Sequence, residues 1–188
     1  MAQPTNWDDH DFEEMAEFDA ECPGDFFTNM KLAKQCWIRC EFSEAEKFYR
    51  SALQIREREF GVNHPALAAP LCGLARIYST MDENQRVEEL LMQALRILEG
   101  TLQFDGPTEA DILAELAGFH SCQGNEQTAE DFYDRTLQSE ERVYGADHGR
   151  VADTLFAYAE MYLEREDYEK ARPLFERCLR IRSEVYGL

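Results

Sequence analysis

The chain repeats the same residues at intervals of 42 positions, and this period constrains its fold more than any other feature. Alanine, an aromatic residue, leucine and glycine recur in one register. The recurring sets are Ala45, Tyr49, Leu53, Glu57 and Gly61, then Ala129, Tyr133, Leu137, Glu141 and Gly145, and then Ala171, Phe175, Leu179 and Gly187. A fixed period of about 20 to 50 residues is typical of stacked supersecondary units rather than of one globular core. The 188 residues leave room for about four and a half copies in one elongated core.

Each unit is predicted to be a helical hairpin. Ala45, Phe48 and Tyr49 begin an apolar stripe with helical spacing, so the stretch from Phe42 to Phe60 is expected to be an amphipathic helix. Ser43 and Glu46 stand three positions apart, which predicts a capping box at its start. Leucine, alanine and tyrosine at helical spacing indicate the other helix of each unit. They are Leu71, Leu74, Ala75 and Tyr78, then Leu113, Leu116 and Ala117, then Leu155, Tyr158, Ala159 and Tyr162.

Small and large residues alternate in a way that predicts close packing of these helices. One position of the first helix always holds alanine, and one position of the second helix holds alanine or valine beside a large side chain. The small residues are Ala33, Ala75, Ala117 and Ala159, and Ala45, Val87, Ala129 and Ala171; the large ones are Tyr49, Leu91, Tyr133 and Phe175. This pattern indicates a core and not a binding site. We expect hairpins at about 26–63, 64–106, 107–147 and 148–188, after a leader over residues 1–25.

The segments between hairpins carry glycine and histidine in matching places. Gly61 and Gly145 can end a helix in a conformation that glycine favours, and Pro65 suits the first turn of the next helix. His64 and His148 share one repeat position, and we expect them to pack within the loops rather than to bind a metal. The second copy departs from the pattern, with Gln103 in place of the glycine and Phe104-Asp105-Gly106-Pro107 in place of the histidine loop, so this junction is expected to bend differently.

Charge and composition exclude several classes of function. Acidic residues outnumber basic ones by 38 to 19, and the formal charge of -19 would repel nucleic acid and anionic membranes. No apolar run approaches the roughly 18 residues of a membrane span, and the acidic N-terminus does not resemble a secretory signal. Six scattered cysteines without a C-x-x-C pair are expected to be free thiols. We therefore expect a soluble, cytoplasmic protein.

The sequence offers poor candidates for catalysis. Cys36 and Cys40 share a helix face, but Cys36 takes a core position and no histidine lies near it in sequence. His120 occupies the repeat position of Cys36, Tyr78 and Tyr162, so it is expected to be a buried core residue and not a general base. We predict no enzymatic activity, no catalytic residue, no metal and no cofactor.

Leu74-Ala75 with Tyr78, followed after a turn by Ala129-x-x-x-Tyr133 and its equivalents, resembles the tetratricopeptide repeat (TPR). The 42-residue period is similar to the longer form found in kinesin light chains. It is marked by A-L-x-I-R-E-x-x-F-G-x-N-H-P over Ala52 to Pro65 and by Cys178-Leu179-Arg180-Ile181-Arg182. The resemblance covers about residues 26–188. It implies an all-α, right-handed superhelical solenoid of antiparallel helix hairpins, and a non-catalytic protein-protein interaction scaffold or adaptor.

The resemblance also implies a binding face. First helices would line a concave groove that binds a peptide segment of a partner protein. The candidate groove residues are Met30, Lys34, Trp37, Arg76, Ser79, Ser121, Phe156 and Glu160. A peptide with an acidic group near Lys34 and Arg76 and a basic or neutral remainder would complement this groove; alternatively, the two cations are only solvated surface charges. The asparagines that kinesin light chains use to hold cargo peptides are replaced here by Cys72-Gly73, Ala114-Glu115 and Phe156-Ala157, so only the general binding mode is expected.

The leader combines nine acidic residues with aromatic ones and has no lysine or arginine. Three interpretations remain open for it. In the first, the leader is a tethered self-ligand that binds in the groove through Trp7, Asp8, Asp9 and Phe12. Tethering raises its effective concentration to about millimolar values, so weak contacts would be enough. Alternatively, the leader forms a short capping helix over the first repeat, or it is a disordered solubilising tail. Asp25 is expected to cap the first repeat helix.

The far side of the last hairpin raises a second functional interpretation. No further helix follows it in this sequence, so this surface would pair with another copy as a homodimer, be covered by a continuation of the chain, or be polar enough for exposure. In this interpretation the protein is a structural assembly module that acts through its ends, and the groove is incidental.

Overall fold

The computed structural model describes residues 25–99 and 109–187, and all regular structure in these ranges is helical. The helices are α1 (Phe26–Ile38), α2 (Phe42–Phe60), the short 3-10 helix η2 (Pro65–Leu67), α3 (Ala68–Thr80), α4 (Asn84–Leu98), α5 (Glu109–Cys122), α6 (Glu126–Tyr144), α7 (Gly149–Glu164) and α8 (Tyr168–Tyr186). The all-α solenoid predicted from the period is confirmed. The leader and the 103–107 junction lie outside the described residues.

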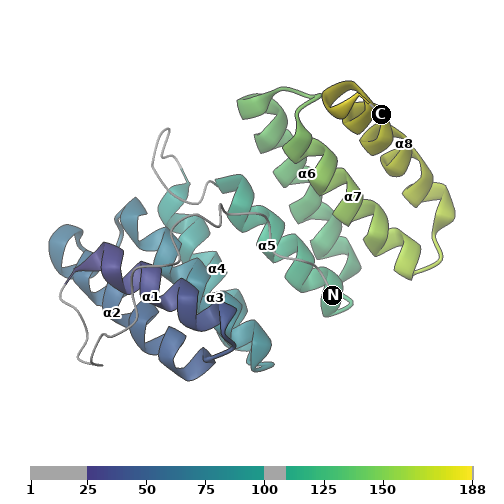
Figure 1. The fold of residues 1–188 in the computed structure, drawn as a ribbon. Coiled ribbons are helices and arrows are strands. Elements are labelled where there is room, and N and C mark those ends of the chain that lie inside the picture. The colour runs from purple at the N-terminus through teal and green to yellow at the C-terminus, as the bar shows by residue number, and fades with distance from the viewer. Residues whose placement is uncertain (1–24, 100–108, 188) are drawn as a thin grey trace.

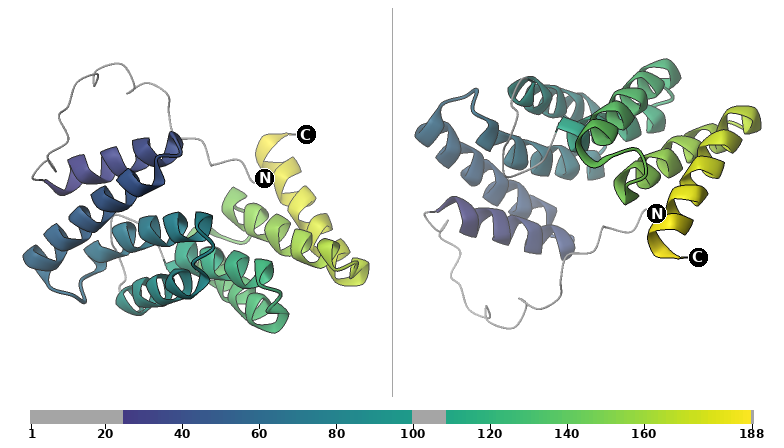
Figure 2. Two further views of the ribbon diagram at one scale, coloured as in Figure 1. Left: turned by 90° about the horizontal axis from the view of Figure 1, so that it is seen from below. Right: turned by 90° about the horizontal axis from the view of Figure 1, so that it is seen from above.

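The helices pair into four hairpins that stack in chain order (Figure 1). The most extensive contacts join α1 to α2, α3 to α4, α5 to α6 and α7 to α8, and each second helix also packs against the first helix that follows it. Two pairs of first helices, α1 with α3 and α5 with α7, contact each other directly. The row of hairpins curves, as the two views of Figure 2 show. We call the surface formed by α1, α3, α5 and α7 the inner face.

The starts of the helices show which capping predictions were right. Asp25 caps α1 as predicted, because its carboxylate accepts a hydrogen bond from the Thr28 backbone N–H at 2.8 Å. The capping box at Ser43 is wrong. The turn before α2 is so short that the helix begins at Phe42, with Glu41 as its N-cap and with no side-chain cap. Ser43 is therefore already inside the helix.

The turns within the hairpins repeat one unusual backbone conformation. Cys40, Asp82, Gly124 and Glu166 stand 42 residues apart, and their φ angles are 61°, 57°, 74° and 61°. A positive φ lets the chain reverse within a few residues, so that two helices can lie side by side. For a residue with a Cβ, the left-handed region costs about 1–2 kcal/mol. Three of the four turns thus use a residue that strains the backbone, and one uses glycine.

The histidines in the junctions between hairpins have a structural role. Gly61 and Gly145 adopt positive φ angles of 86° and 92° and an extended ψ, so they end α2 and α6 without continuing into a left-handed turn. His64 stacks on Phe60 at 4.5 Å between ring centroids, and its Nδ1 accepts a hydrogen bond from the Ala66 N–H. His148 stacks on Tyr144 and caps α7 in the same way. The prediction of loop packing is confirmed, and the capping is an additional role.

One pair of core positions shows how the repeats conserve volume. The first-helix position holds Cys36, Tyr78, His120 and Tyr162, and the second-helix position twelve residues later holds Phe48, Leu90, Phe132 and Leu174. A large residue in one position thus accompanies a smaller one in the other. His120 is buried as predicted, stacks on Phe132 at 5.5 Å, and has its Nδ1 3.3 Å from the Asn125 side-chain nitrogen.

The strained turns predict opposite effects of two substitutions. Gly124→Ala should lower the free energy of unfolding by about 1 kcal/mol, because a Cβ at Gly124 meets no atom within 4 Å and only the backbone is strained. Glu166→Gly should raise it by about 0.5 kcal/mol, because relief of strain outweighs the added freedom of the unfolded chain. Denaturant unfolding of both variants tests this, and a neutral Gly124→Ala would contradict it.

The paired volumes predict a rescue. His120→Tyr should cost about 1–3 kcal/mol, because the larger ring competes with Phe132 for the same space. Adding Phe132→Leu should recover most of this loss, since Tyr with Leu is the pair that two other repeats use. Thermal unfolding of the two single variants and the double variant measures the coupling. Additive losses would show that the two positions do not share volume.

Candidate functional site

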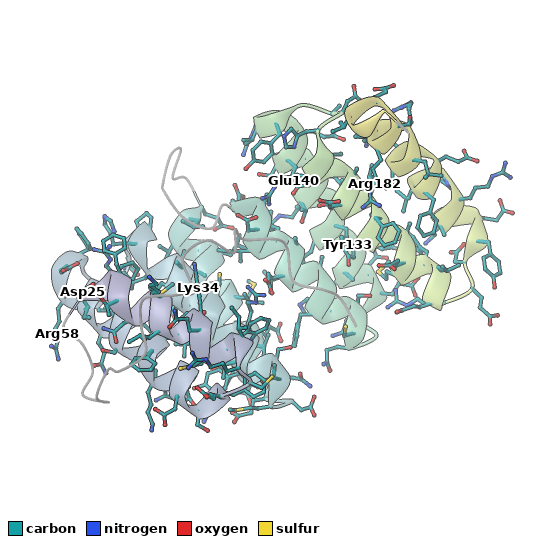
Figure 3. The ribbon with its side chains drawn as sticks, viewed as in Figure 1. Asp25, Lys34, Arg58, Tyr133, Glu140 and Arg182 are labelled. Carbon is teal, nitrogen blue, oxygen red and sulfur yellow. The ribbon has the colours of Figure 1, made fainter. Side chains whose placement is uncertain are left out.

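The eight predicted groove residues all lie on first helices. Lys34, Arg76, Ser79 and Glu160 are exposed, and Met30, Trp37, Ser121 and Phe156 are half-buried. The hairpins separate them into two groups. Met30, Lys34, Trp37, Arg76 and Ser79 belong to α1 and α3, and Ser121, Phe156 and Glu160 belong to α5 and α7. Figure 3 shows Lys34 in the first half of the stack and Tyr133 and Glu140 in the second.

Trp37 and Arg76 form a direct contact between α1 and α3. The guanidinium carbon of Arg76 lies 4.8 Å from the centroid of the Trp37 ring, within the range of a cation–π interaction. The indole nitrogen of Trp37 is buried and has no hydrogen-bond partner among the described residues. The contact holds both side chains in one arrangement.

Two carboxylates on α5, Glu115 and Asp111, lie near this pair. Glu115 is exposed, but the surrounding protein displaces enough water to raise the pKa of its carboxyl; Arg76 lowers this pKa and Asp111 raises it further. Burial also raises the pKa of Cys72 on α3 to about 12, with Glu115 and Asp111 adding to the effect. The Cys72 thiol is therefore protonated and not a nucleophile at neutral pH.

The sequence analysis did not select these α5 carboxylates as site residues. Glu115 stands 42 positions after Gly73, which is buried under the Tyr49 ring, so the register of the repeat did not indicate that Glu115 is exposed. Asp111 also interacts with Arg150 at the start of α7, and Arg150 in turn lies 3.4 Å from the buried carboxylate of Glu140 on α6. The acidic centre of the inner face is thus connected to the next hairpin.

Tyrosines of the second helices also reach the inner face. Burial raises the pKa of Tyr49, and Arg76 lowers it. Burial raises the pKa of Tyr133 to about 12, and Glu160 and Glu164 contribute to that increase. Tyr49 and Tyr133 are 84 residues apart, whereas the equivalent positions 91 and 175 hold residues without a hydroxyl. A hydroxyl at a core position was the sequence signal that we did not use.

The predicted residues of the second half are partly engaged elsewhere. Phe156 packs edge-on against Phe175 at 5.6 Å between ring centroids, and the guanidinium of Arg182 lies 5.1 Å from its ring, so Phe156 supports the α7–α8 hairpin. The Ser121 carbonyl accepts a hydrogen bond of 3.4 Å from Arg165. Glu160 and Glu164 remain exposed and give this end of the inner face a negative charge.

The described residues contain no cluster suited to metal binding. No group of three or more His, Cys, Asp or Glu side chains within 25–99 and 109–187 could hold a metal ion. A hollow on α6 is lined by Thr128, Asp131, Phe132, Asp134 and Arg135, away from the inner face. Burial raises the pKa of Cys36, while the exposed Cys40 has no base beside it in any described contact. No helix in these ranges combines the length and hydrophobicity that a membrane span requires.

The raised pKa of Glu115 predicts a pH-dependent effect on stability. A carboxyl whose pKa is higher in the folded state opposes folding when it is ionised, and this cost disappears as the pH falls through its raised pKa. Glu115→Gln should therefore raise the free energy of unfolding at neutral pH, and the gain should vanish in acid. Glu89→Gln on the outside of α4 removes the same charge and serves as the control. A gain that does not change with pH would contradict the prediction.

The comparisons with known proteins agree with this architecture. The model of the tetratricopeptide repeat matches residues 26–100 and 108–184. Two structures of a kinesin-light-chain-type protein of Podospora anserina, with nearly identical TPR-like repeats, share 21% identity with the chain. The first, of a single-substitution variant, has a TM-score of 0.71, and the match covers 87% of this chain and 77% of that one. The second has a TM-score of 0.69, and the match covers 89% of this chain and 80% of that one.

The structure of BtubC (BKLC) from P. vanneervenii superposes on this chain with a TM-score of 0.75 and 19% identity. The match covers 87% of this chain and 65% of the BtubC chain. At such identities, these structures show a common fold and no more. Comparison with curated protein sequences finds no match. The family model matches well over half of the residues, and the structure consists of the helical hairpins that this family stacks. The chain therefore belongs to the tetratricopeptide repeat family.

Proposed function

We propose that this protein is a non-catalytic scaffold or adaptor that binds a peptide segment of a partner protein on its inner face. Tetratricopeptide repeats generally mediate protein–protein interaction. The observation that carries the proposal is the stack of Trp37 and Arg76 beside the α5 carboxylates. Tryptophan and arginine are among the side chains that dominate binding energy at protein interfaces.

The charges of the inner face define the chemistry of the expected peptide. Lys34 and Arg76 are exposed on α1 and α3, whereas Glu115 and Glu160 are exposed on α5 and α7. A peptide that carries an acidic group at one end and basic or neutral residues toward the other would complement both halves.

Small side chains on α3 and α5 would leave room for the peptide. They are Cys72 and Ser79 on α3 and Gly118 and Ser121 on α5. None of them projects far from its helix. A bulky residue of the peptide could therefore approach the helix backbones while its charged neighbours reach Arg76 and Glu115.

Charge reversal tests this function. The double variant Lys34→Glu/Arg76→Glu should weaken binding about tenfold or more, because it replaces attraction by repulsion at the anchor. The probe is a library of labelled peptides in which the acidic group is moved along the chain, measured by fluorescence polarisation. Lys47→Glu/Arg172→Glu reverses two exposed charges on second helices and is the matched control.

The result distinguishes binding on the inner face from unrelated attraction. Peptides with the predicted order of charges should bind the parent and the control variant, and should lose affinity for the inner-face variant. Equal binding of all three proteins would contradict the proposal. A peptide with the reversed order of charges that binds equally well would show that the charge gradient does not select the ligand.

An assembly module that acts through its ends is the second candidate, and one observation favours it. Leu179 on α8 is 67% exposed, whereas Leu95 at the equivalent position of α4 is 1% exposed. Val185 on α8 is also exposed. These side chains would suit pairing with a second copy. If Leu179→Glu converts a concentration-dependent dimer into a monomer in light scattering while peptide binding persists, the end of the stack serves assembly; a monomeric parent would exclude this candidate.

A further inference from the structure

The first described helix, α1, has an uncovered side where the other first helices are covered. In α3, this side holds Pro70, Gly73, Leu74 and Ile77, and all four are buried. The α2 helix covers them, and the Tyr49 ring lies directly over Gly73. The equivalent residues of α1 are Thr28, Lys31, Leu32 and Gln35. Lys31 is exposed and the other three are half-buried, and no described helix packs against this side.

The neighbouring positions of α1 add apolar surface. Phe27 is 74% exposed and Ile38 is 61% exposed, and they lie near the two ends of the helix. Lys31 and Lys34 lie between them, and α1 contains no acidic residue in a chain of formal charge -19. The uncovered side of α1 is therefore cationic in the middle and apolar at its ends, and a matching occupant would be acidic and aromatic.

The leader has this composition and stands at the right place in the sequence. It contains nine acidic residues and no lysine or arginine, and its residues 7–18 include the large apolar side chains of Trp7, Phe12, Met15 and Phe18. A second helix placed 42 residues before α2 (Phe42–Phe60) would end at Phe18. Trp7 likewise stands 42 residues before Tyr49. Eight positions separate Phe18 from Phe26, as eight separate Phe60 from Ala68.

Helical spacing would place complementary groups of the leader on one side. Trp7, Asp11, Glu14 and Phe18 follow at i, i+4, i+7 and i+11, so a helix over residues 7–18 would present aromatic ends and an acidic middle. This is the inverse of the charge on α1. The other acidic residues would face solvent and form the polar outer surface that the end of a repeat stack requires for solubility.

We propose that residues 7–18 form a helix that docks on the uncovered side of α1, in the place that a preceding second helix would take. Asp11 and Glu14 pair with Lys31, and Phe18 and Trp7 cover the apolar surface. Lys31 has a long side chain at the position where α3 has Gly73. The Trp7 ring therefore lies over the Lys31 ammonium, farther from α1 than the Tyr49 ring lies from α3. This docking does not depend on the function proposed for the inner face.

The experiment uses the full chain with Trp37→Phe, so that Trp7 is the one remaining indole. Docking predicts blue-shifted Trp7 emission and low accessibility to acrylamide. Lys31→Glu should shift the emission to the red and raise the accessibility several-fold, because repulsion from Asp11 and Glu14 releases the helix. Adding Glu14→Lys should restore both signals, since the swapped charges attract again. Lys47→Glu, an exposed position of α2, is the matched control and should change neither signal.

Hydrogen exchange on the chain with both tryptophans provides the second measurement. Docking predicts protection of amides within residues 7–18 and faster exchange there and in α1 after Lys31→Glu. Trp7 that is fully accessible in the parent, with unprotected leader amides, would overturn the proposal and identify a solvated tail. Trp7 that is shielded in the parent, released by Arg76→Glu and unaffected by Lys31→Glu would also overturn it, because the leader would then occupy the inner face.

Discussion

The close approach of helices at alanine positions is the interaction on which the rest of the structure depends. Ala33, Ala75, Ala117 and Ala159 are at most 1% exposed, and each lies in the middle of a first helix. Without a side chain beyond Cβ at these places, the helices of each hairpin can pack at core density, and large residues such as Leu91 and Tyr133 fill the space beside them. These contacts set the distance between the two helices of each hairpin, and therefore the positions of the first helices that carry the inner-face side chains.

The stack holds together across its junctions through polar groups as well as packing. Tyr78 donates a hydrogen bond to Glu46 at 2.7 Å, and Tyr162 donates to Glu130 at the same distance. At the junction between them, the Nε2 of His120 lies 3.9 Å from Glu88. The three acids occupy one repeat position, so α3, α5 and α7 each meet the preceding second helix through an acid and a ring. Such contacts use part of the excess acidic charge to fix the register of neighbouring hairpins.

The inner face differs from these junctions because its charges are less fully neutralised. Arg76 stacks on Trp37 and moderates the charge of Glu115, yet Glu115 keeps a raised pKa. Burial without full compensation is costly for a charged group. A surface that retains this cost gains more from a ligand that supplies the missing charge than a fully paired surface would. This is the physical reason for placing peptide binding at the Trp37–Arg76 stack rather than at the α6 hollow.

The sequence by itself determined the period, the helical hairpins, the core positions and the family, because these depend on side-chain size and hydrophobicity at fixed spacing. It also predicted the Asp25 cap and the burial of His120. It misjudged the start of α2, because the length of the turn at Cys40 overrode the Ser43 capping signal. Only the tertiary structure decided which side chains meet: Trp37 with Arg76, Glu115 with Arg76 and Cys72, and Phe156 with Phe175. These contacts join residues from different helices, and a one-dimensional pattern contains no information on the angle at which two helices cross or on the rotamers that fill the space between them.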